Sequence, residues 1–332
     1  MSQKKETRQI LGSLLWEAQG GVVSGPSLCA RAGITRQAVW KTMERLLEEG
    51  FPLEIIPRRG YRLCQEAPDT LHPLWLSLAA SAVPGKPTFE VLDEVPSTQY
   101  VAREIFRRGV PSPVVVLAES QSEGRGRRGR AWSSPRGCGI YMSALLRPSL
   151  SPRQAPLLSL AAGLAARRGI WRKAGIACDL KWPNDLLRGN GKVCGILTEV
   201  ASDPDQIHFA VVGMGINVNL CGGLVPKDPS PTPPAFLQRE GDPLIHRGWL
   251  VVAILEELVS LVSLLESGGS QGLVAEYESH CATLGRAVRV ITDQEIILGT
   301  ARGISPEGAL VVECTEGVRQ FVSADVIHAS LG

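Results

Sequence analysis

Residues 124–132 read GRGRRGRAW, and this stretch guides the interpretation of the whole chain. Four arginines are interleaved with three glycines, between apolar runs at residues 114–118 and 140–146. Glycine permits positive φ angles and a close approach of the backbone to a ligand, and arginine supplies permanently charged, planar donors for phosphate or carboxylate. The stretch predicts a loop that closes over an anion, in preference to a solvated or RNA-binding Arg-Gly segment. No Gly-Lys-Ser/Thr follows, so it is not a P-loop.

Composition indicates a globular chain whose length allows two or three domains. The 332 residues are 44% hydrophobic and 20% charged, with a formal net charge of +2. So small a net charge argues against a general polyanion binder, and any nucleic-acid surface must be local. The N-terminus has no signal-peptide pattern. Two glutamates interrupt the apolar stretch 249–265, whose helical spacing predicts a buried helix and no membrane span.

The eight cysteines form no CxxC pair, and most have apolar neighbours. We expect small buried thiols in a reducing cytoplasm. The five histidines show no ligand spacing, so a structural zinc site is not expected.

The first 63 residues have the pattern of a winged helix-turn-helix. A helix with apolar residues at 10–15 precedes a short helix at 27–32, which Ser24 and Pro26 introduce, and a further helix opens at Thr35. Residues 53–63 predict a hairpin with a basic tip, the wing. The residues expected to contact DNA are Arg36, Gln37, Lys41, Arg45, Arg58 and Arg59. A helical module for protein contacts is the alternative.

From residue 89 the pattern becomes strands alternating with helices, after a segment rich in Pro, Ala and Ser that we interpret as a linker. Two polar motifs follow strands: KWPND at 181–185 and GMGIN at 213–217. Strand ends are where open sheets place ligand contacts, and alternating glycines allow a flat group to approach. Taken singly, these motifs also fit a polar turn and a bulge, and Lys192 fits an ordinary charge at a strand end.

The order of the motifs resembles the biotin–protein ligases: Ser97-Thr98, Gln121 before GRGRRGR, then KWPND, GKVCGIL and GMGIN. With the winged helix, the chain resembles the bifunctional form, a biotin operon repressor and biotin–[carboxylase] ligase in one chain. The resemblance implies an α/β (α+β) fold with a winged helix-turn-helix at 1–66 and a linker at 67–88. It also implies a central mixed-sheet catalytic domain of the biotin/lipoate-ligase type at 89–283 and an SH3-like β-barrel at 284–332.

In that family, the biotin carboxylate attacks the α-phosphate of ATP, giving biotinyl-5′-AMP and pyrophosphate. A lysine of the biotin carboxyl carrier protein then attacks this mixed anhydride. The resemblance thus implies ATP-dependent, AMP-forming biotin–[acetyl-CoA-carboxylase] ligase activity with Mg²⁺. It further implies biotinyl-AMP-dependent repression at operator DNA of biotin genes, a ligand-promoted homodimer, a cytoplasmic location and no membrane association.

The resemblance also gives roles to single residues. The expected catalytic residues are Lys192, Arg127 and Asp185. The expected biotin-binding residues are Ser97, Thr98, Gln99, Gln121, Arg125, Gly126, Arg127 and Lys192. The expected nucleotide-binding residues are Arg130, Trp132, Asn184, Asp185 and Asn217. Asp185 is expected either to handle Mg²⁺ or to orient the incoming lysine. The family usually has Asn at the position of Gln99, whose longer side chain is expected to donate to the ureido carbonyl.

Three other interpretations fit part of the pattern. A lipoate or octanoate ligase would share the catalytic architecture, and a biotin-sensing transcription factor would need little transferase activity. The GRGRRGR and KWPND motifs favour a biotin ligase, and Arg127 and Lys192 favour retained chemistry. The winged helix could also have lost its operator and serve only to stabilise a dimer.

Overall fold

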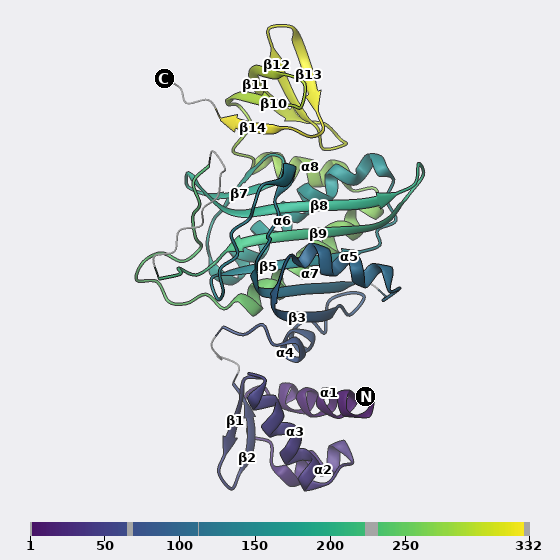
Figure 1. The fold of residues 1–332 in the computed structure, drawn as a ribbon, viewed down its shortest axis with the longest axis vertical. Coiled ribbons are helices and arrows are strands. Elements are labelled where there is room, and N and C mark those ends of the chain that lie inside the picture. The colour runs from purple at the N-terminus through teal and green to yellow at the C-terminus, as the bar shows by residue number, and fades with distance from the viewer. Residues whose placement is uncertain (1, 65–68, 112, 223–231, 329–332) are drawn as a thin grey trace.

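The computed structural model describes residues 2–64, 69–111, 113–222 and 232–328, with side chains from residue 6 onward. Its elements form three tiers along the longest axis (Figure 1). The tiers contain a two-stranded, a seven-stranded and a five-stranded sheet, in chain order from the N-terminus. The predicted fold class is confirmed: an N-terminal helix-turn-helix with a wing, a central mixed sheet and a C-terminal antiparallel sheet.

The first tier forms where the capping residues predict it. Ser24 accepts a hydrogen bond from the backbone N–H of Ser27, and Thr35 accepts one from Ala38, so each side chain satisfies a free donor at a helix start. Gly33, with a φ of 65°, ends the shorter helix in the left-handed conformation. The elements are α1 (Ser2–Glu17), α2 (Gly25–Ala32), α3 (Arg36–Glu48) and the antiparallel hairpin of β1 (Leu53–Ile56) and β2 (Gly60–Leu63).

The central sheet has the order β3-β4-β5-β9-β8-β7-β6, in which only β3 and β4 are parallel. Its strands are β3 (Thr88–Val95), β4 (Val114–Gln121), β5 (Gly139–Leu146), β6 (Asp179–Lys181), β7 (Asp185–Arg188), β8 (Gly191–Ser202) and β9 (Ile207–Asn217). Strand β7 was not predicted. Residues 182–184 form a tight turn between β6 and β7, so Asp185 opens a new strand, whereas the sequence predicts it at the end of the preceding one.

Helices cover both faces of this sheet (Figure 1). α5 (Thr98–Arg107) packs on one face against Val116, while the alternate residues Val115 and Leu117 join the main core on the other. That core includes α6 (Ala155–Ala174), which the short η2 (Pro152–Gln154) precedes, α7 (Arg247–Glu266) and α8 (Ser270–Ser279). α7 is long and apolar enough to cross a membrane, but most of it is buried inside the protein, as the sequence predicts.

The segment predicted as a linker contains a packed helix, α4 (Pro73–Ala79); residues 67 and 68 of that segment lie outside the described residues. Four side chains of α4 are buried, and the helix contacts α1, α7 and β3. It is therefore an ordered connector between the first two tiers.

The C-terminal sheet is antiparallel, with the order β13-β12-β11-β10-β14. Its strands are β10 (Ala287–Ile291), β11 (Ile296–Ile304), β12 (Leu310–Cys314), β13 (Gly317–Phe321) and β14 (Asp325–His328). The last of these was not predicted.

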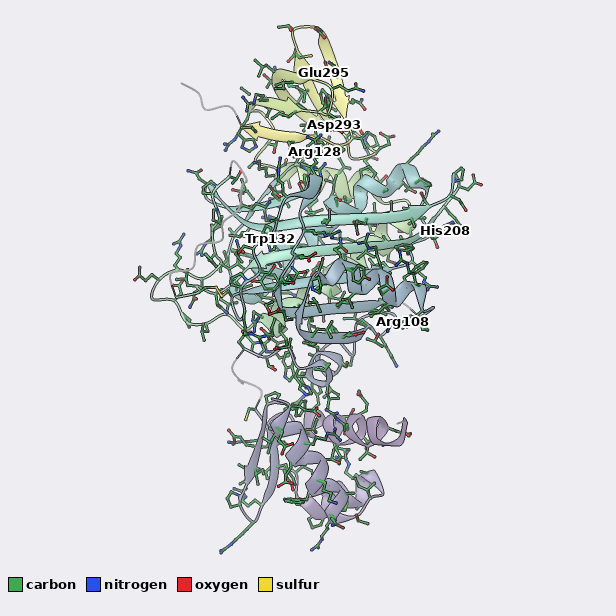
Figure 2. The ribbon with its side chains drawn as sticks, viewed as in Figure 1. Arg108, Arg128, Trp132, His208, Asp293 and Glu295 are labelled. Carbon is green, nitrogen blue, oxygen red and sulfur yellow. A yellow bond between two sulfur atoms is a disulfide. The ribbon has the colours of Figure 1, made fainter. Side chains whose placement is uncertain are left out.

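Two cysteines correct the expectation of free thiols. Cys138 and Cys221 are 83 residues apart in sequence, yet pairing of β5 with β9 brings their Cα atoms to 5.6 Å, and their sulfurs form a disulfide (Figure 2). The other cysteines are free. Burial raises the pKa of the Cys178 thiol to about 12, which makes it a poor nucleophile.

Candidate active site

One cavity gathers twelve of the thirteen residues predicted to bind biotin or nucleotide. Its walls come from α5, the central strands, the arginine-rich loop and the C-terminal sheet. The predicted residues that line it are Ser97, Thr98, Gln99, Gln121, Arg125, Gly126, Arg127, Arg130, Trp132, Asn184, Asp185 and Lys192. The thirteenth, Asn217, is buried outside the cavity, where its side-chain amide donates to the carbonyl of Ala235 at 3.1 Å and supports the segment beside Lys192.

A buried polar network fixes the start of α5. Ser97 is the N-cap residue but makes no side-chain capping bond; instead, the Gln121 Oε1 accepts from the backbone N–H of Thr98 at 2.9 Å. The Gln121 Nε2 donates to Ser134 Oγ at 2.8 Å, and Thr98 Oγ1 lies 2.8 Å from Ser143 Oγ. Sequence reasoning missed Ser143 because it stands within an apolar strand.

Gln99 lines the cavity and leaves one acceptor unpaired. Its Nε2 donates to the carbonyl of Leu197 at 2.8 Å, and its side chain occupies the space beside Gly213, where an added Cβ would lie 3.0 Å from the Gln99 amide. Its Oε1 is buried and has no partner among the described residues. A buried acceptor without a partner is costly, so this oxygen favours a ligand that brings an N–H group. The resemblance predicts that Gln99 donates to the ligand; in the structure its Nε2 donates to Leu197 and its Oε1 is the unpaired atom.

Trp132 covers the two central strands β8 and β9. A Cβ at Gly195 would lie 2.9 Å from the indole ring, and one at Gly215 would overlap it. The sequence predicts that the alternating glycines of β9 allow a flat group to approach. At Gly215 that group is the indole ring of Trp132. The Lys192 Nζ lies 5.2 Å from the centroid of the indole, within range of a cation–π contact.

Strands β6, β7 and β8 bring a carboxylate and two lysines to the cavity. Asp185 Oδ1 lies 3.0 Å from Lys192 Nζ, and both side chains are largely buried. Lys181, the first residue of KWPND, also lines the cavity and donates to Thr232 Oγ1 at 2.7 Å. Burial lowers the pKa of Lys181. The sequence predicts no role for Lys181, although its place in the KWPND motif is the available signal.

The C-terminal sheet holds the arginine-rich loop, whose short helix is η1 (Arg127–Gly129). Arg127 donates to Ser323 Oγ at 2.6 Å, Arg130 pairs with Asp325, and Arg128 pairs with Asp293 at 3.0 Å. Figure 2 shows Arg128 and Asp293 where the two tiers meet. Burial is the main cause that lowers the pKa of Arg127. Sequence reasoning missed Asp325, which is 195 residues from Arg130 and in a different tier.

The residues predicted to contact DNA are all exposed, and they lie on α3 and at the wing tip in the first tier. Arg45 differs from the other five: it pairs with Glu49 at 3.4 Å and lines a second cavity between the winged helix and α4. Trp40 of α3 is also exposed, at 49%, and was not predicted as a contact.

Three segments match known families: residues 7–62 a helix-turn-helix domain, residues 91–217 the biotin/lipoate A/B protein ligase family, and residues 283–329 the biotin protein ligase C-terminal domain. The chain is 33% identical to the bifunctional ligase/repressor BirA of Bacillus spizizenii, over 96% of this chain and 98% of that protein. It is 33% identical to the biotin–[acetyl-CoA-carboxylase] ligase of Mycobacterium tuberculosis, over 65% of this chain and 79% of that protein. The biotin protein ligase from Aquifex aeolicus in complex with biotin and ATP aligns with a TM-score of 0.62 at 26% identity, covering 73% and 99% of the two chains.

Proposed function

This chain belongs to the biotin protein ligase family in its bifunctional ligase/repressor form, and on that premise we propose that it activates biotin with ATP and transfers it to a carrier-protein lysine. The observation that carries the proposal is the composition of the cavity. It is lined both by polar side chains, those of Thr98, Gln99 and Gln121, and by cationic ones, those of Arg125, Arg127 and Lys192. Biotin has the matching form, a polar ureido ring at one end and a carboxylate at the other.

In the proposed first step, the biotin carboxylate attacks the α-phosphate of ATP and pyrophosphate leaves. Negative charge grows on the phosphate oxygens, so fixed cationic donors stabilise the transition state more than the ground state. Lys192 is the proposed donor at the oxygen shared by biotin and phosphate, and Asp185 fixes its position. Arg125 and Arg127 bind the anion from the loop, while Arg130, Trp132 and Asn184 bind the nucleotide.

In the proposed second step, the amine of the carrier lysine attacks the carbonyl carbon of biotinyl-5′-AMP, and AMP leaves. We assign Asp185 the role of orienting this amine, because its carboxylate already holds one ammonium group, that of Lys192. The described residues contain no cluster of three metal-binding side chains. Mg²⁺ commonly uses one or two carboxylates plus substrate phosphates, so Asp185 fits Mg²⁺ that arrives with ATP and would neutralise phosphate charge.

Gln99 supports biotin over lipoate as the substrate. The unpaired Oε1 needs an N–H partner, which the ureido ring of biotin has and the dithiolane ring of lipoate lacks. A site built to hydrogen-bond a ligand group rejects analogues that lack the group.

The same proposal includes a regulatory role for the first tier. The exposed basic residues of α3 and the wing support binding to operator DNA of biotin genes, with biotinyl-5′-AMP as the signal. We also propose a ligand-promoted homodimer, a cytoplasmic location, and domain boundaries at 1–66, 67–88, 89–283 and 284–332.

The direct test incubates the chain with biotin, ATP, Mg²⁺ and the carrier domain of a biotin-dependent carboxylase. Mass measurement should find one biotinyl group added to the carrier, with release of AMP and pyrophosphate. A carrier whose acceptor lysine is replaced by arginine is the control and should gain nothing. A carrier that gains no biotinyl group, but gains lipoyl when lipoate replaces biotin in the incubation, would exclude the proposed substrate, as would a carrier that gains neither.

A further inference from the structure

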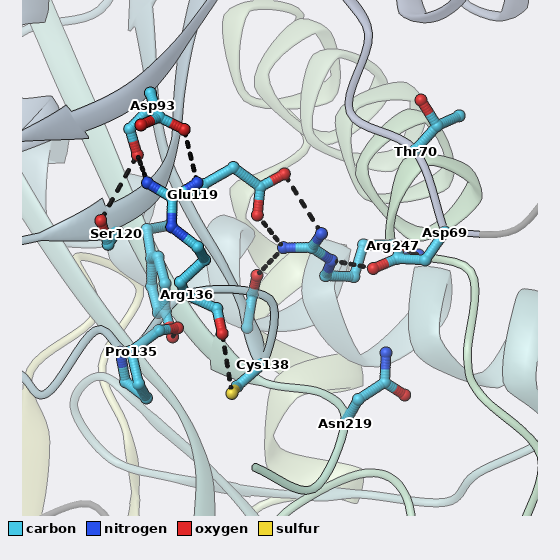
Figure 3. Close-up of polar contacts among 12 residues, drawn as sticks. Asp69, Thr70, Asp93, Glu119, Ser120, Pro135, Arg136, Cys138, Asn219 and Arg247 are labelled. Carbon is cyan, nitrogen blue, oxygen red and sulfur yellow. Dashed lines mark hydrogen bonds and ion pairs between the residues drawn. The ribbon is translucent and has the colours of Figure 1, made fainter. Parts of the chain in front are cut away.

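A buried arginine joins the connector between the tiers to the biotin end of the cavity. Arg247, the first residue of α7, is 4% exposed. Its guanidinium donates to Glu119 Oε2 at 2.8 Å, to the carbonyl of Gly139 at 3.1 Å and to Asp69 (Figure 3). Its backbone N–H also donates to Asp69 Oδ1 at 2.8 Å. One side chain thus bridges the connector, β4 and the start of β5.

Towards the winged helix, Asp69 lies shortly before α4 in the chain, and α4 contacts α1 through aromatic side chains. Trp75 of α4 packs edge-on against Trp16 of α1, with ring centroids 5.9 Å apart, and against Trp249 of α7, at 4.8 Å. A Cβ at Gly248 would overlap the Thr70 carbonyl, so glycine is needed where the connector crosses α7. The first turn of α7 is therefore in close contact with both the connector and the winged helix.

On the side of the cavity, Glu119 and Gln121 are two residues apart on β4, so their side chains lie on the same side of the sheet. The Gln121 side chain holds the start of α5 through Thr98 and the following loop through Ser134. A displacement of Glu119 along β4 would move Gln121, and with it the polar wall that faces the proposed ureido ring.

The bridge joins one buried charge to two partly buried charges: the side chain of Arg247 is 5% exposed, that of Asp69 15% and that of Glu119 24%. Breaking a buried ion pair by removing one partner leaves an uncompensated charge, which is strongly destabilising. Asp69 and Glu119 both depend on Arg247 for this compensation. The three groups therefore favour one relative position of the connector and β4, and a shift of either is resisted by the other.

We infer that Arg247 is a positioning residue through which biotin in the cavity and the winged helix affect each other, along the path Gln121–Glu119–Arg247–Asp69–α4. This inference rests on the proposed function, because it takes biotin as the ligand at Gln121. Biotin that fixes Gln121 would fix Glu119, and the bridge would then hold the connector more firmly against α7.

The test measures hydrogen–deuterium exchange of backbone amides in full-length protein, with and without saturating biotin. In the unaltered chain, biotin should slow exchange in α4 about fivefold or more, the lower range of coupling between sites. Asp69→Asn and Arg247→Lys should reduce this biotin-dependent slowing to less than about twofold. The first variant removes one charge of the bridge, and the second keeps the charge but loses the planar guanidinium that donates to Asp69, Glu119 and the Gly139 carbonyl together. A purely structural role would speed exchange equally with and without biotin, so the biotin-dependent difference is the informative quantity.

Arg168→Lys is the matched control. Arg168 also makes ion pairs to α7 and α8, with Glu257 at 3.0 Å and with Glu276; its side chain is 34% exposed, and it does not touch the connector. This variant should keep the full effect of biotin on α4. Two results would overturn the role of Arg247 and leave the proposed function standing. One is equal slowing of α4 exchange by biotin in all variants, and the other is slowing of exchange in β4 but not in α4 of the unaltered chain. If biotin did not slow exchange in β4 at all, this would contradict biotin binding in the cavity, and it would therefore contradict the inference as well.

Discussion

The Nζ atom of Lys192 lies 3.0 Å from the Oδ1 atom of Asp185, inside the cavity. The β7–β8 hairpin sets this distance, because the two residues stand on paired strands. The carboxylate of Asp185 forms an ion pair with this ammonium group. A preorganised cation of this kind needs no rearrangement when charge develops on a phosphate.

Lys192→Ala should reduce the rate of biotinyl-5′-AMP formation about a hundredfold or more, in line with loss of one preorganised donor. Single-turnover adenylation, measured as pyrophosphate release, is the appropriate assay. Lys173→Ala is the control, since Lys173 lies over the Trp249 ring away from the cavity and should leave the rate unchanged. A normal rate for Lys192→Ala would remove this lysine from the mechanism.

Asp325→Asn should loosen the arginine-rich loop, because Asp325 pairs with both Arg128 and Arg130. Without ligand, limited proteolysis within residues 124–130 should become about tenfold faster, as expected for a segment of low local stability. Biotin with ATP should restore protection, since the adenylate supplies the missing anion. Glu295→Gln removes the partner of Arg319 in the same sheet and should not alter cleavage in the loop. Unchanged cleavage in Asp325→Asn would show that the loop is held by other contacts.

Gln99→Leu should weaken biotin binding about tenfold, because the ureido N–H would lose its acceptor inside a buried site. Titration calorimetry with biotin measures this directly. Gln99→Asn carries an acceptor on a shorter side chain and should retain more affinity than the leucine variant. Equal affinity in all three proteins would place the ureido ring away from Gln99.

Acid should weaken the contact between α4 and the winged helix through His72. Burial lowers the pKa of His72 to about 4 from the ordinary 6.5, and this exceeds the opposing effect of Glu49; Arg8 also lowers it. Between these two pKa values, His72 is therefore protonated in the unfolded chain and neutral in the folded chain. The stability from neutral His72 is complete above pH 6.5 and is lost as the pH falls towards 4.

Thermal unfolding of the unaltered chain and of His72→Asn between these pH values measures the effect. The Tm of the variant should fall less steeply with acid. His328, whose pKa burial also lowers to about 4, is present in both proteins and cancels in the comparison. Parallel curves would mean that His72 does not carry the acid sensitivity.

The features that could be predicted from the sequence are those that depend on residues close to one another in the chain. Ser24 and Thr35 marked helix starts because a capping side chain acts within three residues. Asp325, Ser143 and Arg247 were not found, because each depends on a partner that only the tertiary fold brings close. Asn217 lies outside the cavity for the same reason. Its motif is on β9 as expected, but its side-chain amide donates to the carbonyl of Ala235, a contact that only the tertiary fold creates.

The central claim is that one compound, biotinyl-5′-AMP, is both the intermediate of the cavity and the signal for the winged helix. The most direct test is a DNA-binding titration of the chain on the promoter of its own biotin genes, with and without biotinyl-5′-AMP. The account predicts binding at least about fivefold tighter with the adenylate, and by linkage an equal gain in adenylate affinity when DNA is present. Equal DNA affinity in both conditions, or no binding at all, would contradict it and leave a ligase without a repressor function.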